Sequence, residues 1–476
     1  MTAIDGGLLS PVTVGTDASV TDAAVLDALV TAEVALVRAY GAVGLAPGSA
    51  VDAVSQTLGW QGAGLGCRGH GVELDGLAAA AVAGGNPVIP LVASLRAEVP
   101  EPARTWVHRG ATSQDILDTA LMIIARHATG EVLGALRSTE AALGSLAHAH
   151  RDHVAAARTL TQHAVPTTMG LRAATWLRGV RRAADRLGTT RDALPAQLGG
   201  AGGTLAAFAE LAGGLERPRS AQPSDADAAD TVRDLVAAFA EAVGLAVPDA
   251  PWHVTRWPIT ELGDALVQAV DAVGKLATDV ATLSRTEIGE IAEGSGGGSS
   301  AMPQKRNPAA SVLIRSAAIR APQLGATLHI ASGLAGDERP DGAWHAEWPT
   351  LRELLRLALG AAAHAAALAA GLRVDADAVD RNLGATRGLI IAERLSVVLG
   401  PLVGPDGVRA IVTSVSDGAD LAQAVRLALA DAGIEGVDVE RLIDPRDYTG
   451  LAGELVDDAI AGAAATATDP GDTEAP

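Results

Sequence analysis

Residues 294–308 of this 476-residue chain have the sequence GSGGGSSAMPQKRNP, and they lie between two long segments of helical hydrophobic periodicity. Four of the first five residues are glycine, so the stretch should not hold a rigid shape without a ligand. A flexible linker is one interpretation. A linker does not need paired serines, a lysine and an asparagine followed by proline, whereas a mobile lid over an anionic ligand would use all of them.

Segments with apolar residues at helical spacing surround this loop and make up most of the chain. The first covers residues 19–44, with Thr21 placed to cap its start. Several others exceed the usual length of a globular helix, which predicts an all-α bundle that buries its apolar faces within and between subunits. The predicted central helices cover residues 113–146, 168–187, 225–243, 259–291 and 308–332.

Composition agrees with a helical bundle. Hydrophobic residues make up 48% of the chain and aromatic residues only 2%, which favours closely packed helices over an aromatic-rich β-sandwich. Lys and Arg number 36 against 56 Asp and Glu, a net charge of −20, and there is no basic stripe to follow phosphates. Nucleic acid is therefore not an expected partner, and an anionic substrate would need a local cluster of cations.

The remaining features of the whole sequence indicate the cellular compartment of the protein and the cofactors that it needs. Cys67 is the only cysteine, which excludes an intramolecular disulfide and fits a reducing compartment. No signal peptide and no run of about 18 uncharged apolar residues is found, so we expect a cytoplasmic protein without a membrane segment. Without a metal-ligand cluster or a phosphate-binding fingerprint, neither a metal nor an organic cofactor is expected.

Glycine and proline breaks suggest a division of the chain into domains. Shorter helical stretches occur before residue 107 and after residue 365, on either side of the long segments. The sequence therefore predicts an N-terminal domain at 1–107, a central bundle at 108–365 and a C-terminal domain at 366–476. The last ends in an acidic tail with nothing to bury, which we expect to be disordered.

Residues 106–115, WVHRGATSQD, precede an apolar helical segment. Thr112 and Ser113 could simply cap that helix, and Asp115 could satisfy its first-turn dipole. The same geometry could also bind a substrate carboxylate, because a helix N-terminus presents free N–H groups and partial positive charge. On the residues alone, both interpretations stay open.

Residues 158–170, RTLTQHAVPTTMG, form another polar stretch, which we expect to be a loop. A single histidine such as His163 is more often a hydrogen-bonded structural residue than a catalyst. Further along the chain, Trp344 and Trp348 are four residues apart and predict a helix core pair. Arg339 and His345 beside them are further candidates for substrate contact.

The stretch from Gly298 to Pro308 resembles the signature of the fumarase/aspartase superfamily, Gly-Ser-Ser-x-Met-Pro-x-Lys-x-Asn-Pro, at every defined position. Residues 106–115 and 158–170 resemble the superfamily's other two motif regions. The resemblance covers roughly residues 10–460. It implies a three-domain helical fold, and a homotetramer whose active sites are shared between subunits.

The resemblance also implies roles for individual residues. Ser299 would be the catalytic base for carbon-bound protons, with Lys305 and His163 as the other catalytic candidates. Removing a proton next to a carboxylate creates a dianion that fixed cationic and amide donors must stabilise. A serine can act as the base only if such groups lower its pKa. The expected substrate contacts are Thr112, Ser113, Asp115, His108, Gln162, Asn307 and Arg339.

Two departures from the superfamily pattern restrict the reactions that we expect this chain to catalyse. Fumarases and adenylosuccinate lyases usually have a histidine where this chain has Leu160 and a glutamate where it has Val312. That pair helps to protonate a leaving water or amine. In a muconate lactonisation the group that attacks, and leaves in reverse, is a carboxylate with a pKa of about 4, which needs no proton. The missing pair therefore fits a cycloisomerase.

Residues 85–92 and 342–348 are also similar to cycloisomerase segments, while Ala157 replaces a usual glycine and leaves specificity open. We therefore expect an enzyme that interconverts 3-carboxy-cis,cis-muconate and 4-carboxymuconolactone in the beta-ketoadipate pathway of aromatic compound catabolism. Its partner would be a small tricarboxylate anion. The alternative is a fumarate-releasing lyase of the adenylosuccinate or argininosuccinate lyase type. A non-catalytic scaffold is a third possibility, against which the intact Ser299, Lys305 and Asn307 argue.

Overall fold

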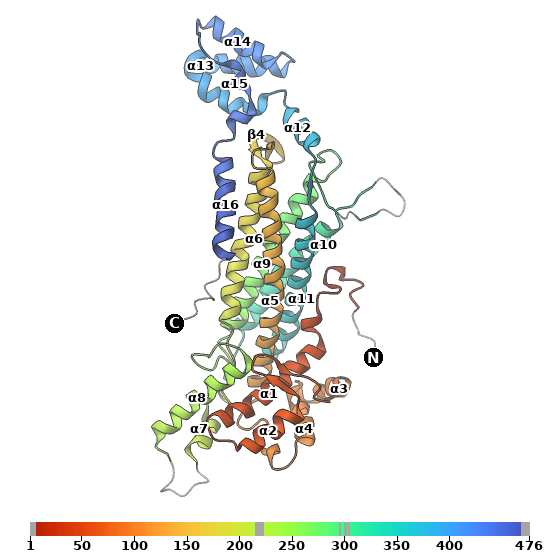
Figure 1. Cartoon of the computed structure of the whole chain (residues 1–476), viewed down its shortest axis with the longest axis vertical. Helices are drawn as coiled ribbons and strands as arrows, with labels where there is room; N and C mark the ends of the chain where they lie inside the picture. The colour runs from red at the N-terminus through yellow and green to blue at the C-terminus, as the bar shows by residue number, and fades with distance from the viewer. Residues whose placement is uncertain (1–5, 215–222, 295–296, 299–301, 303–304, 468–476) are drawn as a thin grey trace, which may run out of the picture. The chain divides into compact units, whose positions relative to one another are not determined.

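The computed structural model describes residues 6–214, 223–294, 297–298, 302 and 305–467 (Figure 1). Within these ranges the protein is built almost wholly of α-helices, with three antiparallel two-stranded ladders. The all-α fold expected from the sequence is therefore confirmed. The predicted base Ser299 and the acidic tail at 468–476 lie outside the described residues.

The chain forms two compact units, each assembled from separate stretches of sequence. Unit 1 comprises Met1–Gly134, Ala183–Asp271 and Ser316–Ala363, and unit 2 comprises Ala135–Arg182, Ala272–Arg315 and His364–Pro476. The three-domain division with boundaries at 107 and 365 stays a prediction. The unit boundaries fall inside five long helices: α5 (Ser113–Ala149), α6 (Met169–Asp192), α9 (Trp257–Leu283), α10 (Ala309–Gly333) and α11 (Gly342–Gly371).

Most predicted helices agree with the observed ones near both ends. Helix α1 (Asp22–Ala42) begins where the hydroxyl of Thr21 accepts a hydrogen bond from the N–H of Ala24, which confirms its capping role. Helix α6 begins directly after Thr168, whose hydroxyl accepts from an N–H of the first turn at 3.0 Å. Helix α8 (Asp225–Val243) has the predicted bounds, with a serine–aspartate capping box at its start.

The structure corrects the expected helix at 259–291. Helix α9 ends at Leu283, and residues 284–290 form turns in which Gly289 has a φ of 66°. These turns bring Glu290 into the protein interior, where it is fully buried. Hydrophobic periodicity alone could not predict this end, because the partners of Glu290 are distant in sequence.

The expected loop at 158–170 is instead a β-hairpin followed by the start of α6. Strands β3 (Val154–Thr159) and β4 (Gln162–Thr168) pair antiparallel, with Thr159 opposite Gln162. The two turn residues, Leu160 and Thr161, have φ of 48° and 71°. Both central residues of a type I′ turn need positive φ, usually supplied by Asn-Gly, so a Leu-Thr turn gives no sequence signal for a hairpin.

Helix α1 lies at the centre of the short elements of unit 1 and is almost fully buried from Leu26 to Tyr40. It packs against α2 and α8 (Figure 1) and also against β2. The Tyr40 hydroxyl donates to the backbone oxygen of Arg109 at 2.7 Å, which ties α1 to the segment before α5. The short elements are η1 (Pro11–Thr13), η2 (Ala18–Val20), α2 (Gly48–Thr57), β1 (Trp60–Gly62), β2 (Gly66–Cys67), α3 (Leu74–Gly84), α4 (Val88–Glu98), η3 (Ala103–Trp106) and α7 (Ala206–Gly213).

A buried ionic network joins three long elements of unit 1. Arg256, just before α9, forms a two-pronged pair with Asp118 of α5, with nitrogen–oxygen distances of 2.7 and 3.0 Å. The same guanidinium binds Glu347 of α11 at 2.6 Å, and the indole of Trp344 donates to Asp118 at 2.9 Å. Trp344 and Trp348 stack edge to face at 4.7 Å, which confirms the predicted pair. Burial raises the pKa of Glu347 despite the nearby guanidinium.

Unit 2 has a hydrophobic core of its own, which includes Leu395, Leu399, Ile411 and Val425. Helices α13 and α14 pack against each other around this core. The remaining elements of unit 2 are β5 (Ile291–Ala292), β6 (Arg373–Val374), α12 (Ala376–Gly384), η5 (Leu389–Ile391), α13 (Ala392–Ser416), α14 (Leu421–Asp431), α15 (Val439–Ile443), η6 (Pro445–Tyr448) and α16 (Ala452–Ala467).

Two helical stretches, Gly342–Gly371 and Leu389–Ser416, are long and apolar enough to cross a membrane. Most of the apolar part of the first is buried inside the protein, as in the core helix of a globular domain. The second is more exposed, but non-helical dihedral angles at Gly404 (φ 75°, ψ 165°) interrupt it. Length and composition alone do not establish a membrane span for either stretch.

Replacing Arg256 with methionine should destabilise the protein by about 3–5 kcal/mol, because Asp118 and Glu347 would stay buried without their cation. Urea denaturation at pH 7 measures the change. Arg233→Ala is the matched control, since Arg233 pairs with Asp230 on the exposed surface of α8 and should contribute little. Equal stability of the Arg256 variant and the control would contradict a structural role for the network.

Candidate active site

One buried carboxylate fixes the N-terminus of α5 in unit 1. Asp115 accepts hydrogen bonds from the N–H of Thr112 at 3.0 Å and from those of Gly199 and Gly200 at 2.8 and 3.0 Å. Nε2 of His253 lies 2.8 Å from its Oδ1. Because both oxygens are occupied inside the protein, the structure favours a positioning role for Asp115, where the sequence predicts direct contact with substrate.

The glycine loop, residues 199–203 with the sequence GGAGG, lies against this helix start and was not predicted as part of the site. A Cβ on Gly199 would lie 2.8 Å from Cε1 of His253. A Cβ on Gly200, whose φ is 73°, would lie 3.3 Å from the backbone oxygen of Gly110. Close approach therefore requires glycine at both positions. The four glycines in five residues were the available signal, but on their own they predict only a turn.

His108 carries a positive charge more readily than an ordinary histidine. Its φ is 58°, and its Nδ1 lies 2.7 Å from the carboxylate of Glu33, a buried residue of α1. Burial lowers the pKa of His108, but the hydrogen bond and charge of Glu33 and the charge of Asp115 offset it, so that the pKa is raised. A protonated imidazole at this position can donate to an anion. Glu33 could not be predicted from the sequence, because no local pattern links it to His108.

Thr112, Ser113 and Arg339 lie at the start of α5 or against the glycine loop. Thr112 is buried and Ser113 is half-buried at the first turn of α5. Arg339 is exposed and donates to the backbone oxygen of Ala201 at 3.0 Å. His345 lies 2.8 Å from the backbone oxygen of Asp341 through Nδ1, which favours a structural role. Unit 1 thus brings Arg339 to the loop that Asp115 joins to Thr112.

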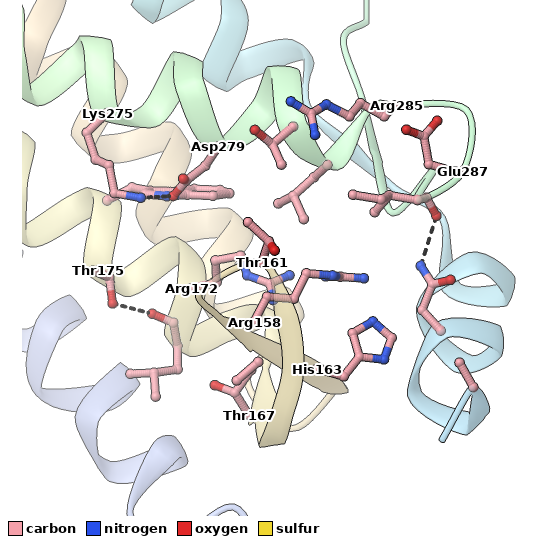
Figure 2. Close-up of a pocket in the computed structure, with 18 residues that line it drawn as sticks. Arg158, Thr161, His163, Thr167, Arg172, Thr175, Lys275, Asp279, Arg285 and Glu287 are labelled. Atoms are coloured by element: carbon pink, nitrogen blue, oxygen red, sulfur yellow. Dashed lines mark hydrogen bonds and ion pairs between the residues drawn. The ribbon is translucent and has the colours of Figure 1, made fainter. Parts of the chain in front are cut away.

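In unit 2 the β3–β4 hairpin borders a cavity of about 780 Å³ (Figure 2). The rest of its wall comes from α6, the end of α9 with the turns after it, and α12. Asp279 and Glu287 also line the cavity, and Asp279 is paired with a lysine. The basic side chains in the wall are Arg158, His163, Arg172, Lys275 and Arg285. In a chain with a net charge of −20, such a local excess of cations suits an anionic ligand.

Glu290 organises these cations from beneath the cavity. Its two oxygens accept from both Nη atoms of Arg158, at 2.5 and 3.0 Å, and from Nη1 of Arg172 at 3.2 Å. The amide of Asn382 donates to it at 2.8 Å. Burial alone would raise the pKa of Glu290, but these donors and charges hold it below its ordinary value. Two guanidinium groups therefore share one carboxylate, which leaves net positive charge at the cavity.

His163 lies directly across the hairpin from Arg158 and lines the same cavity (Figure 2). Burial and the charge of Arg158 lower its pKa, so the ring is neutral near pH 7 and can accept or give a proton. Thr161 also lines the cavity. Gln162 is exposed at the start of β4, and its amide lies 3.5 Å from the hydroxyl of Thr161.

The described residues of the loop at 294–308 are anchored at both ends. Gly297 and Asn307 exchange two backbone hydrogen bonds of 2.9 Å. Just outside them, the carboxylate of Glu293 accepts from the N–H of Ser311 at 2.9 Å and from its hydroxyl at 2.6 Å. Lys305 is exposed on the loop. The described ends of the loop are thus tied to each other and, through Glu293, to the start of α10, which a flexible linker does not require.

No group of three or more His, Cys, Asp or Glu side chains could hold a metal ion in the part of the chain that the structure describes. The predicted residues that the structure places instead fall into two sets. Unit 1 holds a helix start, a histidine paired with a buried glutamate and an exposed arginine, and unit 2 holds a cation-lined cavity and an anchored loop. Both sets are suited to carboxylates.

Comparison with known proteins agrees with this chemistry. The family model described as "Lyase" matches residues 80–214 and 225–322. The chain is 46% identical to nitrosuccinate lyase of Streptomyces davaonensis, over 96% of this chain and 95% of that protein. It is 36% identical to 3-carboxy-cis,cis-muconate cycloisomerase of Pseudomonas aeruginosa, over 92% of this chain and 91% of that protein. The chain belongs to the fumarase/aspartase superfamily of lyases.

Solved structures agree with this membership. The 3-carboxy-cis,cis-muconate lactonizing enzyme of Pseudomonas putida matches this lyase with a TM-score of 0.81 and 32% identity, over 94% of this chain and 96% of that one. A fumarate lyase of Mesorhizobium matches with a TM-score of 0.77 and 30% identity, over 95% and 97%. The family expected from the signature loop is therefore confirmed, and the protein is an enzyme.

Replacing Glu33 with glutamine should lower the pKa of His108 in this lyase. The variant loses the charge that raises the pKa, while burial, which lowers it, remains. The pKa should therefore move from above its ordinary value of about 6.5 to below it. An NMR titration of the His108 ring measures the change, with Glu98→Gln on the exposed surface of α4 as control. An unchanged pKa would show that Glu33 does not set the charge of His108.

Replacing Glu290 with glutamine should change the acid stability of the lyase. A carboxyl group whose pKa falls on folding contributes stability that is present above its unfolded pKa of about 4.3 and is lost as the pH falls through its folded pKa. The variant should therefore be less stable at pH 7 and should lose less stability below pH 4. Denaturation at several pH values measures both, with exposed Glu454→Gln of α16 as control. Parallel pH profiles for variant and wild type would contradict the role of Glu290.

Proposed function

We propose that this lyase eliminates nitrite from nitrosuccinate to give fumarate. The support is the 46% identity, along nearly the whole chain, to a protein named nitrosuccinate lyase. In the reaction, the carbon next to the one that carries the nitro group loses a proton. The electron pair of that C–H bond forms the carbon–carbon double bond. The C–N bond breaks, and nitrite leaves with its electrons, so nitrosuccinate gives fumarate, nitrite and one proton.

The lack of an acid at two positions agrees with this reaction. Leu160 at the hairpin tip is 96% exposed, and Val312 on α10 is 53% exposed. Neither side chain can protonate a leaving group, although water or an amine would need that help. Nitrite, like a carboxylate, is the stable anion of an acid that is ionised at neutral pH, so it departs without a proton.

In this proposal residues of the signature loop and of both sets contact the substrate, and different subunits supply them to each active site. Ser299 takes the proton, and Lys305 and Asn307 stabilise the dianion that develops on the adjacent carboxylate. His163 and Gln162 contact the substrate from the hairpin. Thr112, Ser113, His108 and Arg339 contact the carboxylate at the other end. The substrate is held as an anion throughout, without a metal.

The second candidate is the cycloisomerase reaction predicted from the sequence. It is favoured by the similarity to solved muconate lactonizing enzymes, with a TM-score of 0.81 for the Pseudomonas putida protein. Its leaving group in the reverse direction is a carboxylate, so Leu160 and Val312 suit it for the same reason. The identity to nitrosuccinate lyase, 46% against 36% for the cycloisomerase, places it second.

We also propose that the lyase works as a homotetramer in the cytoplasm, with each active site shared between subunits. Ile319 and Ile330 on α10 are 74% and 63% exposed, and their spacing of 11 residues puts them on one face of the helix, while Leu334, directly after the helix end, is 68% exposed. An exposed apolar stripe of this kind supports a subunit contact. The free, buried thiol of Cys67 is consistent with a reducing compartment.

Purified lyase should convert nitrosuccinate to equal amounts of fumarate and nitrite. Ser299→Ala should lower kcat by about 10²–10⁴-fold, the usual range for loss of a general base, while the neighbouring Ser300→Ala should stay within a few-fold of wild type. Fumarate absorbance and a colorimetric nitrite assay follow both products. Full activity of Ser299→Ala would remove this serine from the mechanism.

The same preparation should be offered 3-carboxy-cis,cis-muconate and adenylosuccinate. Loss of muconate absorbance with no nitrite from nitrosuccinate would replace the proposed reaction with the cycloisomerase. Fumarate from adenylosuccinate, without turnover of the other two, would overturn both candidates.

A further inference from the structure

The glycine loop at 199–203 is held rigidly on its buried side. Its start is fixed by Asp115, which accepts from the N–H groups of Gly199 and Gly200. Its end returns to the same place, because the N–H of Leu205 donates to the oxygen of Gly199 at 2.9 Å. Beneath it, His253 is 3% exposed, and its Nε2 lies 2.8 Å from Oδ1 of Asp115. The loop therefore has one well-supported conformation.

The outer side of the loop offers hydrogen-bond donors that the described protein does not use. No hydrogen bond from the backbone N–H groups of residues 201–204 is found among the described residues, and Ala201, Gly202 and Thr204 are exposed. A Cβ on Gly202 would meet nothing within 4 Å, so there is open space above the loop. The guanidinium of Arg339 lies at the edge of this space, bound to the oxygen of Ala201.

The surroundings of the loop are suited to an anion. The carboxylate of Asp115 that holds Gly200 also holds the N–H of Thr112, so the loop and the N-terminus of α5 lie side by side. That helix start is a region of partial positive charge. Four residues before Thr112 is His108, whose pKa is raised because the hydrogen bond and charge of Glu33 and the charge of Asp115 outweigh the effect of burial. Backbone N–H groups, a guanidinium and a helix dipole together form a site for a carboxylate.

We propose that the glycine loop and Arg339 form a carboxylate subsite that binds one end of a dicarboxylate substrate through the N–H groups of residues 201–204. The substrate class rests on the proposed function, in which the substrate is a dicarboxylate. Asp115 and His253 are the positioning residues of this subsite. They act through the loop backbone and do not touch the substrate.

The buried side of the loop favours this role over that of an ordinary solvated turn. Asp115 is fully buried, and Nδ1 of His253 is buried without a hydrogen-bond partner among the described residues, beside the position that a Cβ of Gly203 would take, 3.7 Å away. Both features cost free energy in a folded protein. A surface turn does not need such support. A loop that must present N–H groups in a fixed array does, because preorganised donors bind an anion more strongly.

Two variants test the subsite without disturbing the buried support. Gly202→Ala puts a methyl group into the open space, and Arg339→Gln removes the cation, while Gly76→Ala on α3, which also has open space, is the matched control. Calorimetric titration of the purified oligomer with succinate should show about tenfold weaker binding for both site variants and no change for the control. For the reaction, KM for nitrosuccinate should rise with kcat within a few-fold of wild type.

The result separates the subsite from the proposed reaction, since succinate binding requires no turnover. Weaker succinate binding in both variants supports the subsite even if nitrosuccinate is not a substrate. Unchanged succinate affinity in both variants would overturn the subsite even if nitrosuccinate is converted. Equal melting temperatures for the variants and wild type ensure that a loss of binding is not a loss of folding.

Discussion

Two buried carboxylates one helical turn apart on α5 determine where the other parts of unit 1 lie. Asp118 is paired with Arg256 and the indole of Trp344, and Asp115 holds the glycine loop and His253. Removing a carboxylate from water costs several kcal/mol, which only a complete set of donors offsets. Burial of these carboxylates on α5 therefore requires that α11, the start of α9 and the glycine loop all pack against it and supply their donors. The same constraint that stabilises the unit also shapes its candidate binding surface.

Basic side chains gather at two places in this lyase, although the chain as a whole is negatively charged. The chain has a net charge of −20, yet the hairpin cavity is lined by arginines, and the pKa of His108, close to the start of α5, is raised. In both places a buried carboxylate keeps the cations in position: Glu290 under the cavity and Glu33 behind His108. Each acid leaves the cation able to meet a ligand on its other side. Buried acids thus organise the basic surface that an anionic substrate requires.

The sequence predicted those features that depend on local or strongly patterned residues. The long helices followed from apolar spacing, and Thr21 and Trp344 had the expected roles because capping and i, i+4 packing are local. The signature loop identified the superfamily because its residues are contiguous. The residues of each such pattern lie within about one or two helical turns of one another, so the pattern can be recognised without knowledge of the fold.

The sequence could not predict interactions between residues that are distant along the chain. Glu290 appeared to continue a helix, because its partners Arg158 and Arg172 are more than a hundred residues away. His253 and Glu33 were missed for the same reason. The hairpin could not be predicted, because its turn residues, Leu160 and Thr161, are not typical of a turn. The paired strands, and not these residues, determine the backbone conformation of the turn. In each case a long-range contact overrides the local preference.

That turn has a consequence for the chemistry of the hairpin. Two residues with side chains occupy left-handed backbone conformations, which cost of order 1 kcal/mol each and persist only when their surroundings hold them. The nearest fixed point is Arg158, clamped on Glu290 two residues before the tip. The strained turn of the hairpin is thus held by the ion pair between Arg158 and Glu290 at its base. Anything that loosens that bond, whether acid or a competing anion in the cavity, would let the tip relax and carry His163 with it.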